Sequence, residues 1–289
     1  MPIYFKILRN GDDFSCSADN GPAFFVGRRV PYEGNIGLYN IFARSRVEKL
    51  NYAASDFQQP HGFWASLIEP TAICEGLNFL TLNTYDRAVF TFGFGQFAAH
   101  VPNGDFVKYF RALLNLPNSS DYFPHLGVVN GRICKTDTAP IPLENDTNTQ
   151  PLMNYLNPNL GEVQDSEVVA AAKLIHWTSS TPAARVAQVT EMVAVFRTFM
   201  SSADTRVGID GCPGNLCCVI ADILHQGRGG AGTTWPQIHR ALGSARPYEA
   251  LLEIGPPKFN SRKATLKRAI DARPAIAAKR WNRAQNDFV

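Results

Sequence analysis

Long apolar segments are missing from this sequence. The first residues, MPIYFKILRNGDDF, contain no basic stretch followed by an apolar one, and no run of about 18 apolar residues occurs along the chain. We therefore expect neither a signal peptide nor a membrane span. Charged residues make up 18% of the 289 residues and hydrophobic residues 45%, which favours a folded globular protein over a disordered or fibrous one.

A disulfide framework and a metal-ligand pattern are also missing. The segment CPGNLCC, residues 212–218, contains no C-x2-C pair and has no histidine beside it, so it does not match a zinc site. We expect no metal and no cofactor. Six cysteines spread over so long a chain are expected to be reduced core residues: Cys16, Cys74, Cys134, Cys212, Cys217 and Cys218.

Positive charge is concentrated at the C-terminal end. Residues 258–289 carry nine Lys and Arg against Asp271 and Asp287, so the rest of the chain is acidic although the net charge is +3. Such a run is typical of the solvated face of terminal helices, with an anionic polymer as the alternative ligand. Because few aromatic residues are interleaved with the charges, we expect no nucleic-acid partner.

Periodicity predicts mixed secondary structure in the first third of the chain. Residues 2–8 are predicted to form a strand, and residues 38–50 and 62–74 are predicted to form helices, the second kinked at Pro70. Residues 89–94 alternate phenylalanine with other residues, which indicates a half-buried strand. These patterns place one sheet segment directly after a helix.

The rest of the chain, from residue 103 onward, is predicted to be mostly helical, apart from one long segment. Residues 117–164 are rich in Pro, Asn, Asp and Gly and are predicted to be a loop insertion. Thr181 and Pro182 are suited to the N-cap and first position of a helix. Further helices are predicted at 103–116, 166–177, from 182 onward, and at 214–226, 235–242, 247–254 and 260–271.

The predicted class is therefore α+β, rich in helix, with a small antiparallel sheet between helical portions. We predict an N-terminal extension of uncertain fold over residues 1–50. Residues 51–289 are predicted to form the main domain, interrupted by the loop at 117–164.

Glu75 is the residue best placed for acid chemistry. It follows an apolar predicted helix and precedes Gly76, so its carboxyl is expected to be partly desolvated, with a raised pKa. A carboxylic acid that stays protonated near neutral pH is what glycoside cleavage requires. The alternative is an ordinary solvated glutamate at a helix end.

The residues after Glu75 resemble the lysozyme-like superfamily, which includes muramidases, lytic transglycosylases and chitosanases. In that superfamily a catalytic Glu ends a helix and a short sheet with a glycine-rich segment follows. The segment DRAVFTFG is similar to the chitosanase pattern, which implies that Asp86 and Thr91 hold the attacking water. The segment GFGQ is similar to that of transglycosylases, which implies that Gln96 lines the sugar cleft, with His100 as a further sugar contact.

Several alternatives stay open for these residues. Only 11 positions separate Glu75 from Asp86, a shorter interval than expected for a chitosanase. As base of an inverting reaction, Asp86 would need its carboxyl about 6.5–9.5 Å from that of Glu75. Otherwise Asp86 caps a turn, Thr91 is an ordinary strand residue and His100 caps the next segment. Glu75 would then act alone, as in lytic transglycosylases.

A second segment carries a weaker resemblance. The sequence IADILHQGRGG, residues 220–230, resembles the helix and glycine turn that lysozyme-like endolysins place under the cleft, and residues 248–271 resemble their terminal helices. This implies that Gln226, Arg228 and Trp235 contact saccharide. The alternative is that Gly227 is a helix cap and Trp235 a core residue.

We therefore expect a glycoside hydrolase that cleaves the glycan strand of bacterial peptidoglycan, a muramidase-type enzyme such as a phage lysin or a secreted antibacterial effector. The first alternative is a chitosanase-like inverting hydrolase, and the second is a catalytically inactive carbohydrate-binding protein. The expected partners are peptidoglycan or a related amino-sugar polymer and an immunity or delivery protein. The enzyme would be made in the cytoplasm and would act in the periplasm or on the cell wall after export or lysis.

Overall fold

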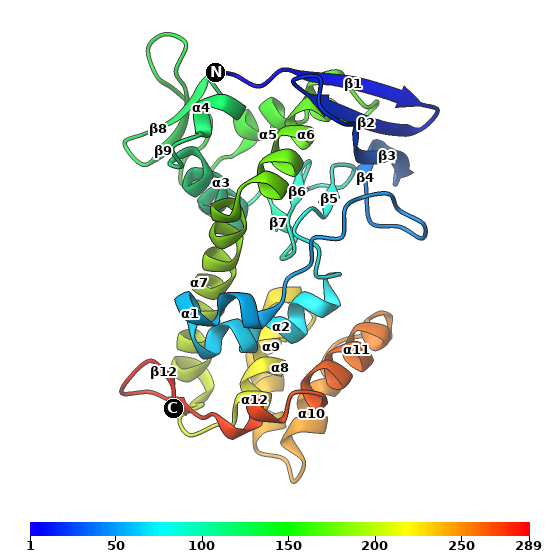
Figure 1. Cartoon of the computed structure of the whole chain (residues 1–289). Coiled ribbons are helices and arrows are strands. Elements are labelled where there is room, and N and C mark those ends of the chain that lie inside the picture. Colours follow the sequence, from blue (N-terminus) through cyan, green and yellow to red (C-terminus); the bar gives the residue numbers. More distant parts are fainter. The chain divides into compact units, whose positions relative to one another are not determined.

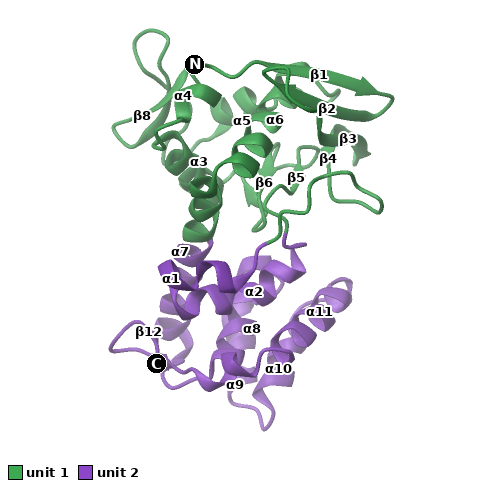
Figure 2. Cartoon of the chain, in the orientation of Figure 1, with its two compact units in different colours: residues 1–51, 78–191 green, residues 52–77, 192–289 purple.

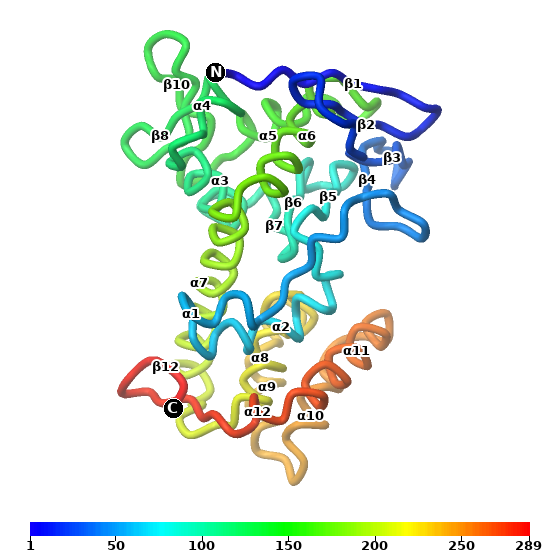
Figure 3. The backbone as a smooth tube through the Cα atoms, viewed as in Figure 1, coloured from blue at the N-terminus to red at the C-terminus, as the bar shows by residue number.

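The computed structural model describes residues 1–289 and has an α+β composition, with 46% helix and 17% strand (Figure 1). The chain divides into two compact units: unit 1 comprises residues 1–51 and 78–191, and unit 2 comprises residues 52–77 and 192–289 (Figure 2). The tube in Figure 3 follows the chain as it passes from unit 1 to unit 2, back again, and into unit 2 a second time. The division therefore differs from the predicted boundary after residue 50.

Unit 1 is built on an antiparallel seven-stranded sheet whose strands lie in sequence order. Residues 1–50 supply four of these strands, so they form part of the main sheet and are not an extension. Its strands are β1 (Phe5–Asn10), β2 (Asp13–Ala18), β3 (Phe24–Tyr32), β4 (Asn35–Tyr39), β5 (Leu82–Asn83), β6 (Thr91–Phe92) and β7 (Phe97–Ala98).

The early predictions hold only in part. The N-terminal strand is confirmed, displaced to Phe5–Asn10, but the predicted helix over 38–50 is wrong. Strand β4 ends there and an irregular segment follows, in which the buried Asn40 side chain bonds Leu80 O at 2.7 Å and Leu82 N at 2.8 Å. The alternating strand over 89–94 shrinks to β6, because Gly93 turns the chain with a φ of 90°.

The predicted loop over 117–164 is folded, which corrects that prediction. A three-stranded sheet forms around the turn at Asn130 and Gly131, whose φ values of 50° and 73° suit a tight hairpin. The buried Glu144 carboxylate accepts hydrogen bonds from Arg111 and ties this sheet to the preceding helix. The elements of this part are α3 (Asp105–Leu114), α4 (Ser119–Tyr122), β8 (Leu126–Val129), β9 (Arg132–Lys135), β10 (Ile141–Pro142), α5 (Gln150–Leu156) and α6 (Asp165–Ser180).

Unit 2 is mostly helical, and long helix α7 (Pro182–Val207) carries the chain into it. The helices predicted at 214–226 and 260–271 are confirmed with the same bounds. The core of this unit includes the edge-to-face pairs of Trp64 with Trp281 and Phe288. Its other elements are η1 (Ala54–Phe57), α1 (Gln58–His61), α2 (Phe63–Cys74), α8 (Gly214–Gln226), α9 (Thr234–Leu242), α10 (Pro247–Glu253), η2 (Pro257–Phe259), α11 (Asn260–Asp271), α12 (Pro274–Ala278), β11 (Trp281–Asn282) and β12 (Asp287–Phe288).

The basic C-terminal stretch is only partly a solvated face. The side chain of Lys263 is largely buried and donates to the carbonyl oxygens of Glu253 and Gly255 at 2.9 and 2.8 Å. The Arg273 guanidinium pairs with Glu69 on helix α2. Several of these cations therefore hold helices together. No helix of the chain combines the length and apolarity that crossing a membrane would need.

Candidate functional site

Glu75 ends a helix that is buried on most of its surface. Helix α2 buries seven of its twelve residues, which include Trp64, Leu67 and Ile68. The chain leaves the helix through Gly76 and Leu77, both with positive φ values, of 93° and 65°. This tight exit keeps Glu75 against the helices packed on α2, so its side chain is only 9% exposed.

Two basic side chains lie against the Glu75 carboxylate. The nearer is Arg262 of helix α11, whose Nη1 is 2.6 Å from Glu75 Oε1, and the other is His225 of helix α8, whose Nε2 lies at 3.4 Å. Arg262 also donates to Asp222 Oδ1 through Nη2 at 2.7 Å, and Arg228 pairs with the other oxygen of Asp222. We call Glu75, Asp222, His225, Arg228 and Arg262 the buried charge cluster.

The cluster decides the charge of its carboxylates. Burial by itself raises the pKa of Glu75, but the hydrogen bond from His225 and the positive charge of Arg262 together outweigh it, and the pKa lies below its ordinary value. Asp222 follows the same pattern with Arg262 and Arg228. The predicted burial of Glu75 is confirmed, but the predicted raised pKa is wrong, because no sequence pattern placed a guanidinium beside it.

A buried cluster of this kind is an unusual way to hold helices together. In many proteins the free energy of removing two ions from water exceeds the free energy gained from their pairing. Well-packed apolar residues in the same place often stabilise the fold more. Buried ionisable groups with shifted pKa values gather at functional sites more often than elsewhere. Glu75, at the edge of the cluster and still 9% exposed, is therefore the member best placed to meet a ligand.

Asp86 lies in a turn of unit 1 that it helps to build. Its Oδ1 accepts the amide of Ala88 at 2.8 Å and its Oδ2 accepts the side-chain amide of Asn83 at 2.9 Å. Asp86 therefore caps this turn, and its role as a base stays a prediction. Thr91 pairs with Asn83 across β5 and β6, so both side chains point from the same face of the sheet, and Thr91 is 5% exposed.

Sequence reasoning missed a row of tyrosines beside this turn. The Tyr85 ring lies 5.2 Å from that of Tyr32 and 6.0 Å from that of Tyr39. Tyr32 is exposed, and the other two are half-buried. Aromatic rings with one free face and a polar end are common at sugar-binding surfaces because they pack on apolar ring faces. No pattern in the sequence indicates this group, because Tyr32 and Tyr39 are more than 40 positions away from Tyr85 along the chain.

The glycine-rich segment has a structural explanation. A side chain at Gly93 would come within 2.5 Å of Gln188 Oε1, and that oxygen accepts the amide of Phe94 at 3.2 Å. Gln96 follows in the same turn and is exposed, with a φ of 49°. His100 is half-buried, and its Nδ1 is buried without a hydrogen-bond partner. Gln96 and His100 remain predicted sugar contacts.

Three other predicted contacts lie in unit 2. Arg228 is buried, with its guanidinium on Asp222 and on the carbonyl of Ile254, so it is not exposed to a saccharide and that prediction is corrected. Gly227 is confirmed as the cap of α8, with a φ of 65°. Gln226 is half-buried at the same helix end, and its predicted role is untested.

Trp235 is not a core residue. It is half-exposed on helix α9, and the guanidinium of Arg206 lies over its ring at 5.3 Å from the centroid. Together with Pro236 and His239 it lines a shallow surface hollow. Its predicted contact with saccharide stays a prediction.

The predicted site residues thus belong to both units. Glu75, Gln226, Arg228 and Trp235 lie in unit 2, whereas Asp86, Thr91, Gln96 and His100 lie in unit 1. Comparisons of this chain with protein families, with curated proteins and with solved structures find no match. The lysozyme-like fold therefore stays a prediction beside the α+β architecture, and the predicted spacing between the carboxyls of Glu75 and Asp86 stays one too.

Proposed function

We propose that the protein is a glycoside hydrolase that cleaves the glycan strand of peptidoglycan, with Glu75 as the proton donor. The observation that carries this proposal is the buried charge cluster around a glutamate at the end of an apolar helix. The resemblance of the following segment to lysozyme-like enzymes supports the same residue. Chitosan is the alternative substrate, with Asp86 as the predicted base of an inverting reaction.

The lowered pKa of Glu75 means that the carboxyl is ionised in the free protein near neutral pH. A general acid must be protonated before it can donate a proton. We expect Glu75 to become protonated when Arg262 moves away from it. Because Arg262 also bonds Asp222, it can leave Glu75 when a sugar enters without becoming an unpaired buried charge. The carboxyl would then be desolvated with only His225 as a partner, which raises its pKa relative to the paired state.

The protonated Glu75 would then donate its proton to the glycosidic oxygen as the bond breaks. Water activated by a second carboxylate completes the reaction in the hydrolytic route, and Asp86 is the candidate for that role. If Asp86 only caps its turn, a substituent of the sugar closes the ring instead, and an anhydro-sugar is released. The two routes differ in product and not in the role of Glu75.

The test is release of soluble fragments from purified peptidoglycan and from chitosan, analysed by mass spectrometry. Wild type should release fragments, and Glu75→Gln should lower the rate by at least about a hundredfold, since general acid catalysis contributes roughly that much. Glu69→Gln is the matched control, because Glu69 lies on the same helix and also pairs with an arginine. The control should keep most of the wild-type rate.

One observation favours the second alternative, an inactive carbohydrate-binding protein. Glu75 is paired with Arg262 and His225 and its pKa is lowered, which suits a purely structural role as well. In that case neither polymer would be cleaved by wild type or by either variant. Binding of the polymers without cleavage would replace the enzyme proposal with the binding one.

A further inference from the structure

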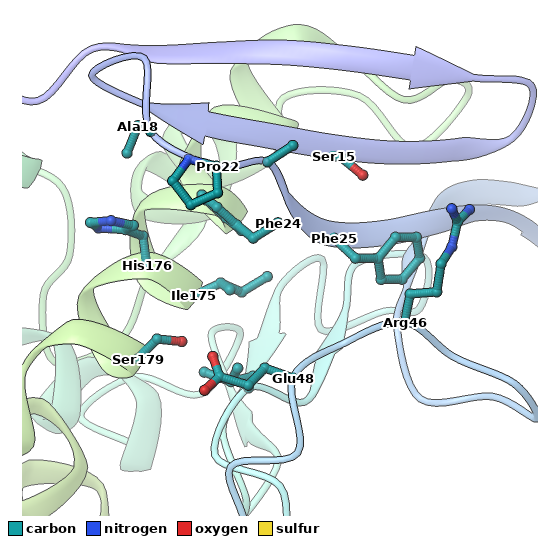
Figure 4. Close-up of a pocket in the computed structure, with 13 residues that line it drawn as sticks. Ser15, Ala18, Pro22, Phe24, Phe25, Arg46, Glu48, Ile175, His176 and Ser179 are labelled. Atoms are coloured by element: carbon teal, nitrogen blue, oxygen red, sulfur yellow. The ribbon is translucent and has the colours of Figure 1, made fainter.

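A cavity in unit 1 is lined by none of the predicted site residues. It has a volume of about 640 Å³, within the range of small-molecule sites. Strand β2, the start of β3, the segment after β4 and helix α6 contribute its walls, as Figure 4 shows. Most of these walls come from residues 1–50, to which the resemblance assigned no role.

The floor of the cavity is apolar. Phe25, Leu80 and Ile175 line it and are almost fully buried, and Phe24 lines it while half-buried. In Figure 4 the side chains of Phe24 and Ile175 face the same space. Such a floor can pack against the apolar face of a ring and would exclude water from beneath it.

The rim carries one carboxylate and several neutral polar groups. Glu48 is exposed, and its carboxylate makes no hydrogen bond or ion pair with the protein. Figure 4 shows this carboxylate turned toward Ser179 and the helix that carries His176. Burial lowers the pKa of His176, so its ring is neutral near pH 7, and its Nδ1 lies 3.0 Å from the hydroxyl of Tyr122.

The one cation at the rim is already engaged. Arg46 pairs with Asp13, and its guanidinium lies 5.6 Å from the centroid of the Phe25 ring. It therefore does not neutralise Glu48. The cavity offers an apolar floor, a free carboxylate at one side, and hydroxyl and imidazole groups that can bond hydroxyls.

We propose that this cavity binds an amino-sugar unit that carries a free ammonium group. The apolar face of the sugar ring would pack on Phe24 and Ile175, the ammonium would pair with Glu48, and ring hydroxyls would bond Ser179 and His176. The choice of an amino sugar with a free ammonium rests on the chitosan alternative of the proposed function, because an N-acetylated sugar carries no such charge. The site itself does not require Glu75 to be catalytic, because Glu75 does not line it.

The probes are a disaccharide of glucosamine and its N-acetylated counterpart, which differ in the ammonium charge. Binding is measured by isothermal titration and by amide NMR shifts, on the full chain. Wild type should bind the glucosamine disaccharide and shift amides around Phe24 and Ile175. The acetylated probe should bind about tenfold more weakly, the loss expected for one charge-assisted hydrogen bond.

Three variants locate the binding. Glu48→Gln should lower the affinity for the glucosamine disaccharide about tenfold and leave the affinity for the acetylated disaccharide unchanged. Ile175→Trp, which fills the cavity, should abolish both signals, and retention of its circular dichroism spectrum shows that it folds. Glu33→Gln, at an exposed glutamate outside the cavity, should bind like wild type.

Equal binding of the two probes, unchanged binding by Glu48→Gln, or shifts that avoid Phe24 and Ile175 would each overturn the inference. The outcome is separable from that of the proposed function. Probe binding without cleavage of either polymer would support this cavity and refute the hydrolase. Cleavage that depends on Glu75, with no binding here, would do the reverse.

Discussion

Two carboxyl groups of unit 1 and two of unit 2 are shielded from water, and their pKa values are shifted in opposite directions. In unit 1, burial raises the pKa of Glu167 to about 7 although Thr84 donates a hydrogen bond to it, and burial raises the pKa of Glu191 to about 7 with Lys108 at 3.8 Å. In unit 2, the pKa values of Glu75 and Asp222 are lowered.

Among Glu167, Glu75 and Asp222 the difference comes from the partners of each carboxyl and not from the depth of burial. Glu167 has only a hydroxyl and backbone groups as neighbours, so its neutral form is favoured. Glu75 and Asp222 share the guanidinium of Arg262, which favours their ionised forms. The hydrogen bond from His225 and the charge of Arg262 therefore favour the ionised form of Glu75, and removing Arg262 should raise the pKa of this carboxyl.

The largest effect is expected from Arg262→Leu. This change leaves the carboxylates of Glu75 and Asp222 buried with fewer counter-charges, and breaking such a pair costs about 3–5 kcal/mol. Urea unfolding followed by tryptophan fluorescence measures the loss. Lys267→Leu on the exposed part of the same helix is the control and should change stability by less than about 0.5 kcal/mol. A similar small change for both variants would contradict the importance of the cluster.

The next largest effect is expected from Glu167→Gln. The folded pKa of Glu167 is about 7 against an ordinary value of 4.5, so unit 1 of the wild type loses stability as pH rises from 4.5 through about 7. The loss is on the order of 3 kcal/mol, because each pKa unit corresponds to about 1.4 kcal/mol. Hydrogen exchange at pH 5 and pH 8, corrected for intrinsic rates, should show a loss that is smaller in the variant than in wild type by about this amount, because Glu191 keeps its own contribution.

Persistence of the full pH-dependent loss in Glu167→Gln would assign it to other groups. Glu191→Gln then becomes the second variant to examine, since its side chain is 13% exposed and its pKa is raised in the same way.

The smallest effect concerns unit 2 in acid. Glu75 and Asp222 have folded pKa values below their unfolded ones, so the stability they contribute is present above about pH 4.5 and is lost as pH falls through the folded values. Hydrogen exchange should therefore show helices α2 and α8 losing protection below pH 4.5. If unit 2 kept its protection down to the lowest pH tested, the pairing of Glu75 with Arg262 would not matter for stability.

Local patterns predicted the parts of the fold that carry their own start and stop signals. Helix α8 lies between Pro213 and Gly227, residues that commonly flank helices, and its predicted bounds of 214–226 are confirmed. The error over residues 38–50 has the opposite cause. Asn40 is held by Leu80 and Leu82, which are distant in sequence, and a window of a dozen residues cannot register such partners.

The candidate site was predictable only as far as single residues. Glu75 stands out because a carboxyl follows an apolar helix, and Asp222 carried a similar signal as the one charge in the apolar run VIADIL. Arg262 carried no such signal, because it is one of nine Lys and Arg residues within residues 258–289. Its contact with Glu75 exists only because α11 packs on α2, and this contact, together with the hydrogen bond from His225, reverses the predicted pKa shift.

Carboxyl carbon NMR of the full chain, titrated with and without a saturating chito-oligosaccharide, tests this account most directly. In the free protein Glu75 should titrate below pH 4.5 and Glu167 near pH 7. With the oligosaccharide bound, the pKa of Glu75 should rise while that of Glu167 stays unchanged. A pKa of Glu75 that lies above 4.5 in the free protein, or that does not move when the sugar binds, would contradict the proposed role of Arg262 and of Glu75 as proton donor.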